Sequence, residues 1–427
     1  MAKQRFIIKN AHIINAAKRS YDASELLVTM HEDNSWYIEQ ISDTIVDVTA
    51  RSVNASGLYI TPAFIDIWSH MGEIGFDYRE TYSTGTNAAV CGGYSHLVLA
   101  PDGKKVIDSP SILERRVNDA KRTGKCNISF CAAVTKGLAG RELCDYSALK
   151  KLGAVTFSDG KYESMPDAFL YEAMLGIKKA DSLLIAHPRY HNCYNSPSVN
   201  RGRISKILGV EGIPCSAESL DVARYLLYAA ETGCRLHICG ISCEASIELI
   251  AQAKRKGIAV TASTSPQYFS FSDDDILFYG ARAAVWPPLR TRNDVSAVID
   301  ALSDGTIDCI VSDHTPLAKE EKGNVIKDCT DGTISLQTTF SAANTYLVTP
   351  GHIDVFRLID LMYTSPSRIL GINHDLKESS EANINLISLD REFIVTNNYL
   401  KSRSSNSIFM GLNLRGCVDS SYITITY

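Results

Sequence analysis

In the stretch TPAFIDIWSHMG (residues 61–72), an apolar run leads directly into a candidate metal ligand. The run FIDIW (64–68) is short and apolar on both faces, as is typical of a strand buried in a parallel sheet. His70 follows it and could bind a metal ion. A second ligand would make chemical sense two residues earlier, but Trp68 stands there. The stretch therefore has the outline of a metal site with an indole in one ligand position.

Seven further runs of this kind follow along the chain. They are SHLVLA (95–100), ISFCAAV (128–134), AVTFS (154–158), LLIAH (183–187), RLHICG (235–240), IAVTAST (258–264) and CIVSDH (309–314). Amphipathic segments separate most of them, and several of these segments end in glycine, as helices often do. Eight strand–helix units in about 310 residues predict a (β/α)8 barrel of the TIM type.

The two ends of the chain have a different pattern. Residues 1–57 and 377–427 are rich in short alternating runs, such as RFIIKNAHII near the start and YITITY at the end. Alternation of this kind is typical of strands that are buried on one face only. We expect both ends to pair into one small composite β-domain, with the barrel spanning residues 58–376.

Composition excludes several classes of protein. The chain of 427 residues is 45% hydrophobic and 21% charged, with a net charge of −5, so it lacks the basic surface expected of a nucleic-acid-binding protein. No apolar run is long enough to cross a bilayer, and the first residues lack the apolar core of a signal peptide. We therefore expect a cytoplasmic protein.

The chain has twelve cysteines and no CxxC pair, which favours free thiols in a reducing compartment. The tightest cluster of possible soft ligands is His237, Cys239 and Cys243. A metal site there is an open alternative. Filling of the core by a buried strand is the favoured interpretation.

Polar side chains follow several of the predicted strands. They are His70, Asp102, Asp159, His187, Asp313 and His314. In barrels of this kind the chemistry takes place at the carboxyl ends of the strands. Imidazoles and carboxylates that converge there are what a zinc-activated hydroxide needs. An aspartate after the last strand could bind metal and also carry a proton from the attacking water to the leaving amine.

Longer stretches resemble the dihydroorotases of the amidohydrolase superfamily over nearly the whole chain. They are TPAFIDIWSH, YRETYSTGTNAAVCGGY, GIPCSAESLDVARYLLYAAETG, VWPPLRT, DGTIDCIVSDHTPLAKEEK and SPSRILGI. GTIDCIVSDH, followed by proline and EEK, is typical of the dihydroorotase side of this superfamily. The resemblance implies a barrel with a composite β-domain from both termini, and a binuclear metal site.

The same resemblance implies which residues would bind the metal ions. The retained family positions are His70, Asp159, His187 and Asp313, the last of which is also the position of the general base. The His-x-His motif of the family reads Trp68-Ser69-His70, and the ligand after HIC is Gly240. Neither an indole nor a glycine can donate a lone pair to zinc. Each metal ion would therefore lose one imidazole.

Four positions implied to bind the substrate also differ from the family. An arginine is replaced by Gly72, two asparagines are replaced by Asp102 and Trp286, and a histidine is replaced by Leu317. Each charge-assisted contact contributes roughly 1.5–3 kcal/mol, so the loss of several should abolish useful binding of the anionic substrate.

Three hypotheses follow. In the first, the chain is a catalytically inactive dihydroorotase homologue with no cofactor, and it forms an oligomer as a structural partner of aspartate transcarbamoylase in pyrimidine biosynthesis. In the second, it is an active zinc-dependent dihydroorotase or cyclic amidohydrolase, which hydrolyses the ring amide with a reduced metal site. In the third, the remodelled pocket binds another small ligand between Trp68 and Trp286. The first is our leading prediction.

Overall fold

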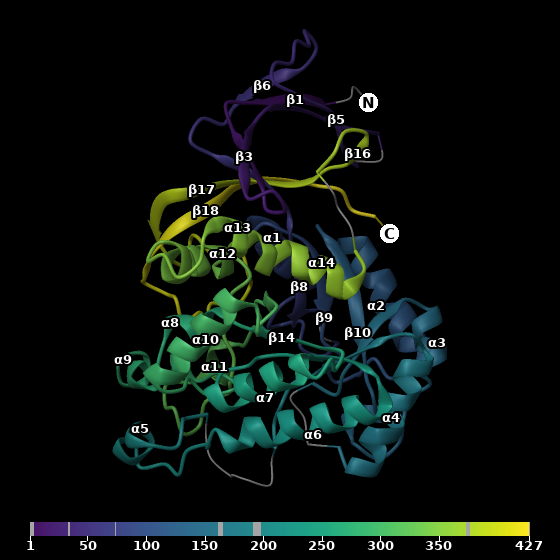
Figure 1. Ribbon diagram of the computed structural model, residues 1–427, viewed down its shortest axis with the longest axis vertical. Coiled ribbons are helices and arrows are strands. Elements are labelled where there is room, and N and C mark those ends of the chain that lie inside the picture. Colours follow the sequence, from purple (N-terminus) through teal and green to yellow (C-terminus); the bar gives the residue numbers. More distant parts are fainter. Residues whose placement is uncertain are drawn as a thin grey trace.

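A closed barrel of eight parallel strands forms the larger part of the molecule (Figure 1). The computed structural model describes the chain except residues 1–3, 33–34, 73, 161–164, 191–197, 373–375 and 427. The barrel strands are β8 (Phe64–Ser69), β9 (Tyr94–Leu99), β10 (Asn127–Ala132), β11 (Ala154–Phe157), β12 (Leu183–Ala186), β13 (Arg235–Ile238), β14 (Val260–Thr264) and β15 (Cys309–Ile310), paired in this order. Each predicted run overlaps one of them, so the predicted barrel fold is confirmed.

The barrel closes where β8 meets the segment after β15, and we call this contact (Asp66, Ser69, Ser312 and His314) the barrel seam. Ser69 and His314 form a parallel bridge, and the backbone nitrogen of His70 donates to the carbonyl oxygen of His314 at 2.9 Å. The carboxylate of Asp66 accepts hydrogen bonds from the backbone nitrogen of Ser312, at 3.0 Å, and from its hydroxyl group. Asp66 is fully buried, and this burial raises its pKa to about 7.

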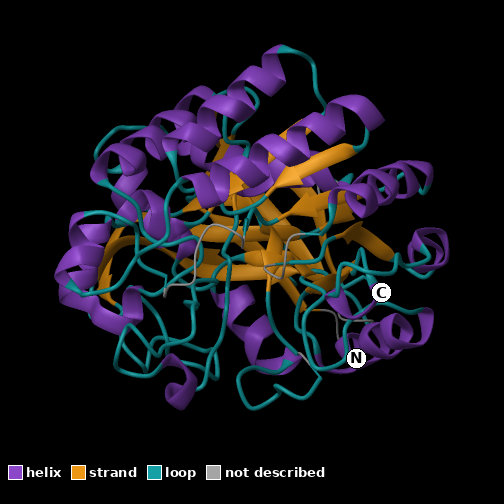
Figure 2. Ribbon diagram, turned by 90° about the horizontal axis from the view of Figure 1, so that it is seen from below, coloured by secondary structure: helices purple, strands orange, loops and turns teal. Residues whose placement is uncertain are grey.

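Helices surround the strands, as Figure 2 shows. The longer ones are α1 (Tyr82–Cys91), α2 (Pro110–Thr123), α4 (Asp167–Lys179), α6 (Ser216–Thr232), α7 (Glu244–Arg255) and α10 (Arg292–Asp304). The shorter ones are α3 (Tyr146–Lys151), α5 (Arg203–Ile207), α8 (Pro266–Ser270), α9 (Ile276–Tyr279), α11 (Lys319–Lys322), α12 (Thr339–Ala343), α13 (Val355–Ile359) and α14 (Ser365–Leu370). Side-chain caps begin some of them: Thr81 accepts from the backbone of Thr84 and starts α1.

Both ends of the chain contribute to two five-stranded sheets beside the barrel (Figure 1). One sheet contains β16 (Ser380–Glu381), β5 (Trp36–Ser42), β4 (Glu25–Met30), β1 (Gln4–Lys9) and β6 (Arg51–Asn54), in that order. The other contains β18 (Asn413–Ile423), β17 (Asn383–Ile394), β7 (Tyr59–Pro62), β2 (His12–Asn15) and β3 (Ser20–Ala23). Strand β7 lies inside the segment predicted for the barrel, yet it pairs with β17 and β2.

Apolar residues that alternate along these strands fill the space between the two sheets. Ile8, Val28, Ile60 and Ile384 belong to one buried cluster, to which both ends of the chain contribute. In the described part of the chain, no helix combines the length and the apolar character that crossing a membrane requires. The packing of the two sheets follows the alternation seen in the sequence.

A long connection between β17 and β18, residues 395–412, leaves the sheet and runs along the barrel. The amide nitrogen of Asn406 donates to the carbonyl oxygen of Thr315 at 2.9 Å, and its amide oxygen accepts from the backbone of Leu317 at 3.1 Å. The backbone nitrogen of Ile408 donates to the hydroxyl oxygen of Thr333 at 3.0 Å. The connection therefore holds the loops that follow the last barrel strand.

Candidate functional site

We use the name barrel mouth for the residues that follow the carboxyl ends of the strands, together with Trp68. His70 follows β8 and is 4% exposed. Its Nδ1 atom forms an ion-pair contact with the carboxylate of Asp102, which follows β9. A carboxylate in this place orients the imidazole. The structure therefore brings together a predicted metal ligand and a predicted substrate-binding residue.

The indole of Trp68 is fully buried and lies between two imidazoles. Its ring centroid is 5.6 Å from that of His70, edge-on, and 5.9 Å from that of His187. Aromatic rings at these distances pack in van der Waals contact. Trp68 therefore occupies the space between two positions at which the family resemblance implies metal ligands.

The position of the missing fourth imidazole is closed by backbone geometry. Gly240 has a φ of +77°, which side chains of L-amino acids rarely adopt. A Cβ atom at this position would lie 3.0 Å from Nε2 and 3.2 Å from Cε1 of His187, and 3.6 Å from Cδ of Pro287. The ring of His187 therefore packs against bare backbone, where the family would have a ligand side chain.

Asp159 follows β11, and its carboxylate holds the loop after β10. It accepts hydrogen bonds from the backbone nitrogens of Val134, at 2.8 Å, and Thr135, at 2.9 Å, and from the hydroxyl of Thr135 at 2.6 Å. Burial raises the pKa of Asp159. Asp159 and His187 line the same cavity of about 10 Å³, which is roughly the space of one water molecule.

Asp313, the predicted general base, follows β15 in a left-handed backbone conformation with a φ of +48°. Its side chain is 3% exposed, and one carboxylate oxygen accepts from the side-chain nitrogen of Gln267 at 3.4 Å. A residue other than glycine keeps such a conformation only when its surroundings fix it. The neighbouring His314 points elsewhere, since its Nδ1 accepts from the backbone nitrogen of Ser335 at 3.2 Å.

At Gly72 no side chain fits the space. A Cβ atom there would lie 2.3 Å from Cε1 of Tyr82, and the φ of Gly72 is +60°. Arg116, which is fully buried on α2, donates from Nη1 to the carbonyl oxygen of Gly72 at 2.7 Å. The ring of Tyr82 therefore fills the space that the arginine of the family would need.

The two other altered substrate positions, Trp286 and Leu317, are buried. Trp286 packs with Ile213 and Ala217, and the guanidinium of Arg189 lies 4.2 Å from the centre of its ring. This is a cation–π contact. Leu317 is 3% exposed and is held by the β17–β18 connection.

The residues present do not fit a binuclear zinc centre. Positions 68 and 240 offer no donor, and the carboxylate of Asp159 is engaged by the loop after β10. Within the described ranges, no group of three or more His, Cys, Asp or Glu side chains is placed to hold a metal ion. The structure pairs His70 with Asp102 and places His187 beside Asp159, but it does not join the four retained ligands into one set.

The cluster of His237, Cys239 and Cys243 matches the core interpretation. Both ring nitrogens of His237 are hydrogen-bonded, Nδ1 to Thr261 at 2.8 Å and Nε2 to Ser263 at 2.9 Å. Burial lowers the pKa of His237 to about 3, so the imidazole is neutral. Thr261 and Ser263 occupy both ring nitrogens of His237, so neither nitrogen is left to bind a metal ion.

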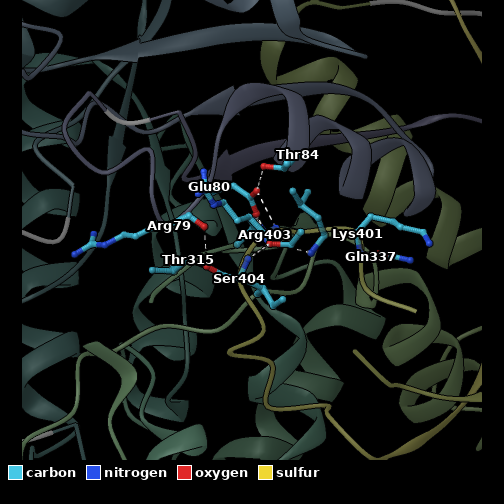
Figure 3. Close-up of polar contacts among 12 residues, drawn as sticks. Arg79, Glu80, Thr84, Thr315, Gln337, Lys401, Arg403 and Ser404 are labelled. Atoms are coloured by element: carbon cyan, nitrogen blue, oxygen red, sulfur yellow. Dashed lines mark hydrogen bonds and ion pairs between the residues drawn. The ribbon is translucent and has the colours of Figure 1, made fainter. Parts of the chain in front are cut away.

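A polar cluster surrounds Glu80 (Figure 3), and none of the sequence patterns predicted it. The carboxylate accepts from the hydroxyls of Thr84 and Ser402 and, at 3.1 Å, from the backbone of Arg403. Nε2 of His314 lies 3.5 Å away. Burial acts to raise the pKa of Glu80, but His314 and the hydroxyl donors hold it below its ordinary value. Since His314, Ser402 and Arg403 are more than 200 residues away, spacing in the sequence cannot reveal them.

Comparisons with known proteins agree with this architecture. Residues 57–246 match a family model described as dihydro-orotase-like. A protein named dihydroorotase from Thermoanaerobacter sp. is 35% identical over 423 residues, covering 98% of this chain and 96% of that protein. One from Listeria monocytogenes is 32% identical, covering 95% of this chain and 94% of that protein.

Among solved structures, an L-hydantoinase (dihydropyrimidinase) from Arthrobacter aurescens superimposes with a TM-score of 0.86 at 22% identity, covering 99% of this chain and 97% of that one. At this identity the likeness shows the fold. The sequence relatives show more, because they are at least 30% identical over nearly the full chain. The chain therefore belongs to the dihydroorotase-like family of the amidohydrolase superfamily.

Proposed function

We propose that this chain is a catalytically inactive member of its family and a structural partner of aspartate transcarbamoylase in pyrimidine biosynthesis. The contact of the His187 ring with the backbone of Gly240 carries the proposal, because a ligand side chain there would start from a Cβ atom only 3.0 Å from Nε2 of His187, in a backbone conformation that side chains rarely adopt. Opening a ring amide in this family depends on a metal-bound hydroxide, and that requires a complete ligand set. The donors of this chain do not form one.

The substrate positions support the same proposal. Dihydroorotate is an anion, and its carboxylate would need a cationic or neutral donor at the barrel mouth. Position 72 has no side chain, and Tyr82 fills the space beside it. Asp102 brings a carboxylate to the mouth, and this carboxylate contacts His70. It offers no hydrogen-bond donor to an anionic substrate. Restoring the metal alone would therefore not restore binding of the substrate.

A partner surface is proposed on helix α6, which lies at the end of the barrel away from the two terminal sheets (Figure 1). Leu220 and Leu227 are 50% and 66% exposed. They are seven residues apart and therefore share one face of the helix. A specific interface buries at least about 1,200 Å² in total and has apolar residues near its centre.

The proposal is tested by size-exclusion chromatography of the full chain with the aspartate transcarbamoylase of the same genome. We expect one complex of fixed ratio, which Leu227→Glu weakens at least tenfold. Ile394→Glu is a matched control, because Ile394 is 59% exposed at the end of β17. Two separate peaks with unchanged transcarbamoylase activity would contradict the partnership.

The zinc-dependent hydrolase is the alternative, and the names of the sequence relatives favour it. Zinc content and hydrolysis of dihydroorotate, measured on the same preparation, separate it from our proposal. We expect neither stoichiometric zinc nor turnover. Turnover that depends on added zinc and is lost in Asp313→Asn would establish the hydrolase instead.

A further inference from the structure

Two cysteines precede the first turns of neighbouring helices. Cys215 comes before α6, and Cys243 comes before α7. The Sγ atom of Cys243 lies 3.9 Å from the carbonyl oxygen of Cys215, so this thiol lies against the backbone of the other cysteine. A disulfide needs two cysteines whose Cα atoms lie within about 7 Å, and a thiol packed against the backbone of the other cysteine meets the need for close approach.

A buried polar network fixes one of these thiols in place. The Sγ atom of Cys243 is 3.4 Å from Oε1 of Glu218 and 3.2 Å from the hydroxyl of Ser246. Glu218 also accepts from the backbone nitrogens of Ser242, at 3.1 Å, and Cys243, at 3.3 Å. Because this carboxylate lies on α6 and accepts from the backbone at the start of α7, it ties together the two segments that carry the cysteines.

The two thiols differ in exposure and in reactivity. Cys243 is buried, whereas Cys215 is half-buried. The hydrogen bond from Cys243 lowers the pKa of the Cys215 thiol, and the nearby Arg290 acts in the same direction. By contrast, burial raises the pKa of the Cys131 and Cys309 thiols in the barrel core. Since the thiolate is the reactive form, Cys215 is the thiol prepared to react first.

We propose that Cys215 and Cys243 form a reversible disulfide when the protein meets a hydroperoxide. The thiolate of Cys215 attacks one peroxide oxygen, the O–O bond breaks, and the leaving oxygen takes up a proton to give water or an alcohol. Cys215 is then a sulfenic acid. The sulfur of Cys243 attacks it, the S–O bond breaks, and the hydroxide leaves as water with the proton of Cys243. Two thiols lose two electrons, and the peroxide gains them.

The bond would join the beginnings of α6 and α7 at the wall of the barrel mouth. Ile213 and Ala217, on either side of Cys215, pack against Trp286. The disulfide would therefore fix the segment that covers this indole. The inference does not depend on the proposed function, since it concerns thiols that no ligand or substrate position includes.

The test uses the full chain treated with hydrogen peroxide, then alkylated while denatured and mapped by mass spectrometry. We expect loss of two of the twelve thiols, a linked peptide pair containing Cys215 and Cys243, and full recovery with dithiothreitol. Cys329→Ser is the matched control, because Cys329 is also half-buried, and it should leave the linked pair intact. Cys215→Ser and Cys243→Ser should each abolish the pair.

The order of the two steps has its own readout. In Cys243→Ser, a sulfenic acid should accumulate on Cys215 and react with dimedone, and circular dichroism checks that the variant is folded. A sulfenic acid formed equally fast on Cys243 in Cys215→Ser would overturn the order. A peptide pair that joins Cys215 to Cys193, which lies outside the described residues, would overturn the site itself. So would a pair that stays reduced while other thiols are oxidised.

Discussion

The barrel seam and the barrel mouth share strand β8, and two residues on that strand contrast sharply. Asp66 is a carboxyl group in the core that the backbone and hydroxyl of Ser312 satisfy. Trp68, two residues later, is an indole where the family resemblance implies a metal ligand, and it packs against His70 and His187. The seam keeps polar groups that closure of the barrel needs. At the mouth, packed side chains and bare backbone occupy positions where the family would have metal ligands.

Breaking the seam should have the largest effect. Asp66→Ala removes the acceptor of two buried donors of Ser312, and we expect it to lower the free energy of unfolding by about 3–5 kcal/mol. Urea denaturation measures this change. Asp300→Ala, at an exposed position on α10, is the control and should stay within about 0.5 kcal/mol of the parent. An equal loss of unfolding free energy in the two variants would show that Asp66 contributes no more to stability than an exposed residue does.

The pH dependence of stability sharpens the same contrast. Because the pKa of Asp66 rises to about 7 in the folded state from 3.8, the folded protein keeps a proton that the unfolded chain has lost between these values. Stability from this group therefore falls as pH rises, by about 2–3 kcal/mol between pH 5 and pH 7. Denaturation curves at several pH values should show this slope in the parent and not in Asp66→Asn. Parallel pH profiles would contradict it.

At the mouth, Gly240→Ala should cost about 1–2 kcal/mol more than its control. The control is Gly257→Ala, because Gly257 has nearly the same φ, +76°, and nothing within 4 Å of a Cβ atom. The excess measures the contact with His187 alone. Adding His187→Ala should relieve it, and thermal unfolding of Gly240→Ala, Gly257→Ala, His187→Ala and the Gly240→Ala/His187→Ala double variant completes the comparison. No excess would mean that the mouth tolerates a side chain at position 240 and could be rebuilt as a ligand site.

The smallest effect is expected at Arg189. Arg189→Ala removes the cation over the ring of Trp286 and should cost about 0.5–1 kcal/mol. A change in tryptophan fluorescence should accompany it, because the environment of one indole changes. Arg115→Ala, at an exposed position on α2, should change neither stability nor fluorescence. An unchanged emission spectrum in Arg189→Ala would show that the stacking does not persist in solution.

Periodicity predicted much of the fold, since short runs that are apolar on both faces and separated by amphipathic segments are typical of buried parallel strands. It overestimated the last strand, because CIVSDH contains only the two-residue β15 before the chain turns to form the seam. It could not place β7 with the terminal sheets, because that pairing depends on β17, more than 300 residues away. Residues that follow each strand were predictable as members of the mouth. The domain limits and the proposed partner stay predictions.

What the site residues do with their side chains was not predictable. Asp159 turns toward the backbone of Val134 and Thr135, and that choice depends on the shape of a loop. The ring of Tyr82 fills the space beside Gly72. In the sequence, Tyr82 is simply the first residue of a helix capped by Thr81, and nothing there points to Gly72. Such features depend on backbone dihedral angles and on contacts between distant segments. The sequence therefore located the mouth and identified its missing donors, but not the packing that replaced them.

The β17–β18 connection has a consequence for how the protein is made. A ribosome completes every barrel strand before it makes Ser402, Arg403 and Asn406. Until then, the carboxylate of Glu80 and the backbone around Thr315 lack these partners. Chains elongate at about 5–20 residues per second, so a nascent barrel waits several seconds with this edge incomplete. The barrel is thus synthesised early and finished late, and chaperones that bind nascent chains would find their longest opportunity at this edge.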